Sequence, residues 1–89
     1  MTLPEAVKQA LTLAHEWAMT TAQKSWTAAN AVAYINEVWS LRDKIPPCIP
    51  FDDALQTQLL YARSNLVGWR GPTAVQAKRI IDEYIRSLA

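Results

Sequence analysis

Three of the five prolines in this 89-residue chain fall within the short segment IPPCIP, residues 45–50. Proline lacks a backbone N–H and its ring clashes with the preceding helical turn, so no helix can run through this segment. Each proline also biases the residue before it toward extended backbone. We therefore expect a stiff, extended crossover that separates two stretches of regular structure.

Both stretches have the composition and the apolar spacing of helices. Alanine is abundant and glycine occurs only twice, which favours helix over sheet. Apolar side chains recur at intervals of three and four residues, which places them on one face of a helix. The pattern predicts four helices, at about 3–22, 26–45, 52–67 and 72–88.

Capping residues indicate where two of these helices begin and where one ends. Thr2 and Glu5 have the spacing of a capping box. Asp52 is the expected cap of the third helix, with Phe51 packing just before it as a hydrophobic staple. Gly68 is expected to end that helix in the left-handed conformation that glycine adopts without strain.

The junction TTAQKSW, residues 20–26, is less well defined because it contains neither glycine nor proline. Its threonines and serine disfavour helix interiors and favour turns and caps. We expect a short break near residues 23–26, with Ser25 or Thr27 capping the second helix. A single long bent helix is the alternative.

The predicted fold is all-α: a small four-helix bundle built from two helical hairpins joined by the proline-rich crossover. Residues 1–89 form one domain, because a second core would have too little chain to bury. Short connections make the first and second helices antiparallel neighbours, and likewise the third and fourth. Charged residues make up only 19% of the chain, which favours a buried interface with a partner.

Charge and targeting signals exclude several classes of protein. The formal net charge is +1, so no strong overall field selects nucleic acid or a membrane surface. The charge is uneven, at −2 for residues 1–53 and +3 for residues 54–89. The single cysteine implies no disulfide, and the chain shows neither a signal peptide nor a membrane-spanning apolar run. We expect a cytoplasmic protein that does not enter the membrane.

No arrangement of residues specifies catalysis, a cofactor or a metal site. His15 is the only histidine, and Glu16 beside it points elsewhere on a helix. Cys48 lies between prolines without an evident orienting acid or oxyanion hole. We expect a histidine at the rim of the bundle and a cysteine packed in the crossover. A pairing of Cys48 with His15 in an enzyme is the alternative that spacing leaves open.

Four tryptophans are more than a chain of this length usually contains. Trp17 and Trp39 fall on apolar stripes and are expected in the core. Trp26 and Trp69 flank turns, where an aromatic ring either closes one end of a core or anchors a partner. Protein interfaces favour tryptophan and arginine, and Arg70 directly follows Trp69. We therefore expect Trp26, Trp69 and Arg70 to bind a partner protein.

The segment LVGWRGPTAVQAKR, residues 66–79, allows a second interpretation. A glycine-containing turn between two helices also occurs in helix–turn–helix units, which place the second helix in the DNA groove. The nucleic-acid-binding residues would then be Arg63, Arg70, Gln76, Lys78, Arg79 and Arg86. Two glycines and a proline make this turn longer than in a compact unit, and the basic excess is small.

The sequence therefore predicts a small, non-catalytic protein–protein interaction module that forms a homodimer or binds another protein. The contact surface is expected to include Trp26, Trp69, Arg70 and the outer side of the fourth helix. The alternative is a nucleic-acid-binding regulator that uses the third and fourth helices.

Overall fold

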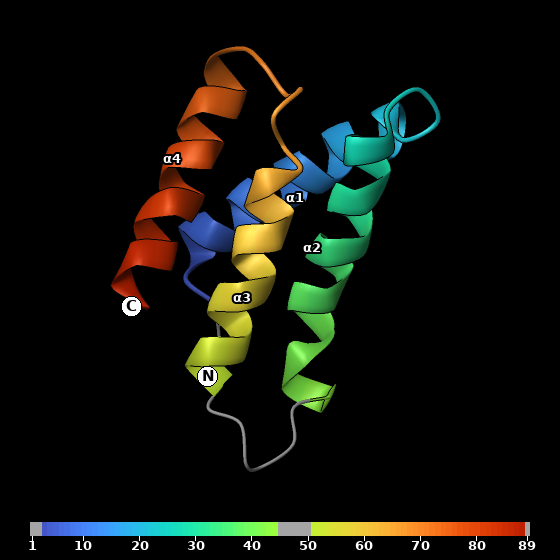
Figure 1. Ribbon diagram of the computed structural model, residues 1–89. Coiled ribbons are helices and arrows are strands. Elements are labelled where there is room, and N and C mark those ends of the chain that lie inside the picture. Colours follow the sequence, from blue (N-terminus) through green and yellow to red (C-terminus); the bar gives the residue numbers. More distant parts are fainter. Residues whose placement is uncertain (1–2, 45–50, 89) are drawn as a thin grey trace.

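The computed structural model describes the backbone of residues 3–44 and 51–88, and the side chains of residues 3–40 and 53–88. Within these residues the chain forms four helices and no strand (Figure 1). The helices are α1 (Glu5–Thr21), α2 (Trp26–Lys44), α3 (Phe51–Ser64) and α4 (Pro72–Ser87). The predicted all-α four-helix bundle is confirmed, whereas the proline-rich crossover lies outside the described residues.

Each helix packs against two others. Helix α2 contacts α1 and, more extensively, α3, while α4 contacts α1 and, less extensively, α3. In Figure 1, α2, α3 and α4 run up and down the view, and α1 passes obliquely behind them. Both predicted neighbour pairs, α1 with α2 and α3 with α4, are present. The most extensive contact nevertheless joins the two hairpins, between α2 and α3.

The core is built from aliphatic side chains that follow the predicted helical spacing. The largest fully buried side chains come from all four helices and from the loop after α3: Leu11, Ile35, Leu55, Leu59, Leu66 and Ile81. Buried alanines dominate the facing sides of α1 and α2, among them Ala14, Ala18, Ala28 and Ala31. Small side chains at a helix contact allow the two axes to approach closely.

The start of α1 differs from the prediction. The helix begins at Glu5, and Pro4 occupies the capping position with φ −55° and ψ 147°. That ψ is extended rather than helical, so Pro4 is the residue at which the chain enters the helix. No side chain caps this end. The predicted capping box of Thr2 with Glu5 is therefore wrong, since Glu5 is the first helical residue instead of the third.

The break between α1 and α2 is confirmed, and Ser25 is its cap. The Oγ of Ser25 accepts a hydrogen bond from the backbone N–H of Ala28 at 3.3 Å, which is the usual geometry of a serine cap. Ser25 Oγ also lies 2.9 Å from Thr27 Oγ1. A single bent helix is thereby excluded, and Trp26 becomes the first residue of α2.

The two ends of α3 also depart from the prediction. The helix begins at Phe51, so Asp52 lies inside its first turn rather than before it, and the side chains of both residues are outside the described set. At the other end α3 stops at Ser64, and residues 65–68 continue as turns. Gly68 does not have the predicted positive φ; among the described residues only Gly71 does, at 108°. Gly71 therefore provides the left-handed residue, and it does so at the start of α4.

The packing of α3 predicts a sharp contrast between two adjacent leucines. Leu59 is fully buried and Leu60 is 47% exposed. We expect Leu59→Ala to lower the free energy of unfolding by about 3 kcal/mol, because it leaves a cavity in the core. Leu60→Ala is the matched control and should change it by roughly 0.5 kcal/mol or less. Urea denaturation followed by circular dichroism measures both, and equal losses would contradict this assignment of the core.

Candidate anion-binding groove

Helices α3 and α4 form the two sides of an open groove of about 360 Å³. Its lining is mostly basic: Arg63, Val75, Lys78, Arg79, Asp82 and Arg86. Five of these residues lie on α4; Val75, Arg79, Asp82 and Arg86 recur at intervals of three and four, which aligns their side chains along one helix face, and Lys78 lies beside Arg79. Arg63 comes from the last turn of α3 and faces them.

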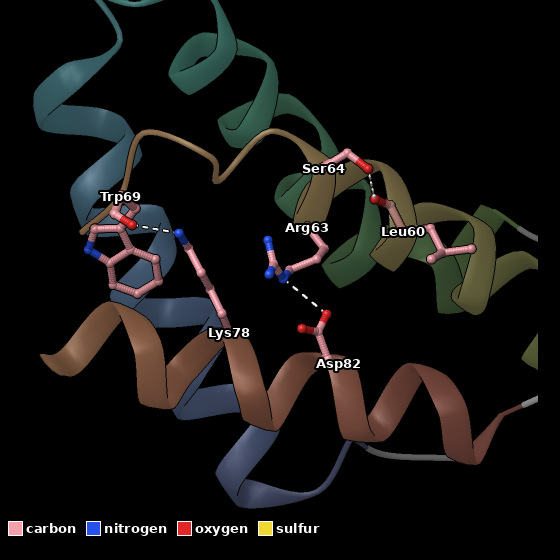
Figure 2. A network of polar contacts seen from close by, with 6 residues as sticks. All are labelled: Leu60, Arg63, Ser64, Trp69, Lys78 and Asp82. Carbon is pink, nitrogen blue, oxygen red and sulfur yellow. Dashed lines mark hydrogen bonds and ion pairs between the residues drawn. The ribbon is translucent and has the colours of Figure 1, made fainter. Parts of the chain in front are cut away.

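An ion pair joins the two sides of the groove. Arg63 Nε lies 3.0 Å from Asp82 Oδ1, as Figure 2 shows. Both side chains remain partly exposed, so the pair contributes roughly 0.2–1 kcal/mol to stability. The pair links the last turn of α3 to the middle of α4 across the groove.

Lys78 connects α4 to the loop that precedes it. Its Nζ donates a hydrogen bond to the backbone carbonyl of Trp69 (Figure 2). Burial lowers the pKa of Lys78 below its ordinary 10.5, and the positive charges of Arg63 and Arg70 lower it further. Asp82 acts in the opposite direction. The balance shows that positive charge outweighs negative charge around the ammonium group.

Two further cations of the groove have no structural task in the described part of the chain. The side chains of Arg79 and Arg86 are exposed and make no hydrogen bond or ion pair with another described residue. They lie seven residues apart, which on a helix corresponds to about 10.5 Å along the axis. Between them stands Asp82, whose carboxylate is engaged by Arg63. The groove can thus hold anionic groups at two separated positions.

The structure places Trp69 inside the protein rather than on its surface. Only 7% of the residue is exposed, and its indole stacks on that of Trp17 with ring centroids 6.0 Å apart. The expectation that the Trp69 side chain anchors a partner is therefore wrong. The ring closes the core where α1 meets the loop between α3 and α4. Arg70, the next residue, is exposed.

Trp26 has the opposite environment. It is 80% exposed, the largest value among the large apolar side chains of the described residues. Its position at the start of α2, directly after the Ser25 cap, points it away from the core side of the helix. The predicted partner-binding residues Trp26, Trp69 and Arg70 thus do not share one environment.

The predicted nucleic-acid-binding residues are only partly brought together. Four of them line the groove: Arg63, Lys78, Arg79 and Arg86. The positive charge of Arg70 contributes, after burial and Arg63, to the lowered pKa of Lys78. Gln76 does not join them. It lines a separate groove of about 180 Å³ between α1 and α4, opposite residues such as Gln9 and Leu13. The first turns of α4 face α1 on that side, unlike those of a recognition helix that is free to enter DNA.

Of the two candidates for enzyme chemistry, only His15 lies among the described residues. His15 is half-buried, and its ring packs against Trp39 with centroids 5.1 Å apart. Its Nε2 is buried and has no hydrogen-bond partner among the described residues. Trp39 is exposed, so its predicted place in the core is wrong. Cys48 lies outside the described residues, and no cluster of three metal-ligating side chains exists among the described ones.

Sequence reasoning named the groove's cations but missed Asp82 and Val75. Asp82 follows Lys78 and precedes Arg86 by four residues, which is the spacing of charged pairs on a helix and was visible in the sequence. The pairing of Asp82 with Arg63, nineteen residues away, had no such local signal.

Comparison of the chain with protein-family models, curated proteins and solved structures gave no match. Among the described helices, none is both long and apolar enough to cross a membrane.

The environment of Lys78 predicts how its contribution to stability depends on pH. Because its pKa is lowered in the folded protein, the unfolded chain binds more protons at this site as pH approaches 10.5. Charged Lys78 therefore stabilises the folded state less than neutral Lys78 would, and this difference disappears as pH rises. We expect the difference in unfolding free energy, wild type minus Lys78→Met, to increase from neutral pH to 10.5. Denaturant titrations across that range measure it, and a decreasing difference would contradict the assignment.

Proposed function

We propose that this chain is a small, non-catalytic protein–protein interaction module that associates as a homodimer. The observation that carries the proposal is the 80% exposure of Trp26, the first residue of α2. Tryptophan is enriched at the centres of protein interfaces, where one ring accounts for much of the binding energy. Trp69, by contrast, already has its packing partner within the chain.

The energetics support burial of this ring in a complex. A tryptophan that becomes buried removes about 150–250 Å² of surface from water, at roughly 25 cal/mol per Å². In the isolated chain most of the Trp26 surface stays in contact with water, and a chain of this size has only a modest core. Association with a second copy is a common way for a chain of this size to gain stability.

Removal of the Trp26 ring should weaken self-association. We expect Trp26→Ala to raise the dimer dissociation constant roughly 30-fold, which corresponds to a loss of about 2 kcal/mol at an interface hot spot. Size-exclusion chromatography with light scattering over a concentration series measures it. Leu60→Ala removes a different exposed apolar side chain and should leave the constant unchanged. A wild-type chain that stays monomeric throughout would refute the homodimer.

A nucleic-acid-binding regulator is the second candidate. One observation favours it: Arg63, Lys78, Arg79 and Arg86 gather along one groove. The net charge of +1 and the separate position of Gln76 count against it.

This candidate has its own test, fluorescence anisotropy with a labelled random duplex. A phosphate-binding groove should bind the duplex at low salt, with an affinity that falls steeply as salt is added. Contacts by about three cations would give a slope of roughly −3 in the logarithmic salt plot. Absence of salt-sensitive binding would remove this candidate and leave the protein–protein proposal intact.

A further inference from the structure

The basic face of α4 holds more positive charge than the fold uses. Arg63 pairs with Asp82, and Lys78 holds the Trp69 carbonyl, so both cations have a role within the hairpin. Arg79 and Arg86 have no such partner among the described residues, although they flank Asp82 on the same face. Side chains that extend into solvent on a rigid helix can meet a ligand without any rearrangement of the bundle.

An exposed apolar side chain precedes these charged residues on α4. Val75 stands four residues before Arg79, lines the same groove and is 59% exposed. Apart from Lys78, which holds the Trp69 carbonyl, the groove presents in order along α4 an apolar side chain, a cation, a carboxylate and a second cation. A ligand that matches this order carries one apolar group and two anionic groups, with a neutral stretch opposite Asp82.

We propose that the groove between α3 and α4 binds an acidic helical segment of another protein. Two carboxylates of that segment, seven residues apart, pair with Arg79 and Arg86, and an apolar side chain of the segment covers Val75. The inference goes beyond self-association through Trp26 and uses different residues. In Figure 1, the turn between α1 and α2 lies on the opposite side of the view from α4.

The spacing of the charges favours discrete carboxylates over a nucleic-acid backbone. Each strand of a duplex carries one phosphate about every 3.4 Å of helix axis, so a strand aligned with α4 would place several phosphates within the 10.5 Å between the two arginines. At least one of them would lie against the carboxylate of Asp82, where like charges repel. A helical segment can instead place uncharged residues there. Val75 also offers nothing to a phosphate, but it fits an aliphatic side chain.

The surroundings of Arg63 and Lys78 add to the attraction. In Figure 2, the terminal nitrogens of Arg63 point away from Asp82, toward the side on which Lys78 lies. Burial lowers the pKa of Lys78, and the positive charges of Arg63 and Arg70 nearby lower it further. This side of the groove is therefore positive even where its cations are already hydrogen-bonded, and an approaching carboxylate is attracted along its length.

Fluorescence anisotropy with a designed peptide tests the inference. The probe is a labelled alanine-based helical peptide with two glutamates seven residues apart and a leucine four residues beyond one of them. The matched peptide carries glutamine in place of both glutamates. We expect the glutamate peptide to bind at low salt and the glutamine peptide to bind roughly tenfold more weakly, because it can form neither ion pair.

Two double variants with the same change in net charge separate the groove from general electrostatics. Arg79→Glu with Arg86→Glu reverses the two groove cations, whereas Lys8→Glu with Lys24→Glu reverses two exposed cations elsewhere. We expect the first pair to weaken binding of the glutamate peptide at least about tenfold and the second pair to change it by about threefold or less. Circular dichroism confirms that both double variants keep their helices.

Three outcomes would overturn the inference. They are equal binding of both peptides, equal weakening by both double variants, and duplex binding that is lost in the Arg79→Glu, Arg86→Glu variant without any peptide binding. The last would assign the groove to nucleic acid. The proposed homodimer fails separately: a monomeric wild type that still binds the glutamate peptide refutes self-association alone, and a Trp26-dependent dimer without peptide binding refutes the groove alone.

Discussion

The stacking of Trp69 on Trp17 is the contact on which the arrangement of the C-terminal half depends. The indole of Trp69 packs against α1, while its backbone carbonyl accepts a hydrogen bond from Lys78 on α4. One loop residue thereby joins two helices that are far apart in the sequence. With this loop held in place, Gly71 adopts its positive φ and α4 starts in a fixed direction along α1.

The direction of α4 decides which of its side chains meet α3. Ala77 and Ile81 turn into the core, Gln76 turns toward α1, and Asp82 reaches Arg63. Once these contacts are made, a row of cations is left along the outer edge of the α3–α4 contact. The groove is therefore a consequence of how the hairpin packs. Its proposed ligand chemistry follows from Arg79 and Arg86, which have no partner among the described residues.

Local signals predicted the fold well and the helix ends unevenly. Ser25 caps α2 as expected, because the serine and the N–H groups that it serves lie within three residues of each other. Gly68 was assigned the left-handed conformation that belongs to Gly71, since both glycines precede the same helix and composition does not distinguish them. The cations of the groove were named as possible nucleic-acid contacts of a helix–turn–helix unit, whereas the Arg63–Asp82 pair was not predicted, because it joins two different helices.

The sequence by itself determined that the fold is all-α, where α2 and α4 begin, and which apolar stripes form the core. These features depend on contacts between residues no more than four positions apart, which a periodic pattern records. Only the tertiary structure decided that Trp69 is buried while Trp26 and Trp39 are exposed, and that four cations share one groove. Burial of an aromatic residue at a turn depends on which helix lies opposite it, and that is set by packing between segments distant in the chain.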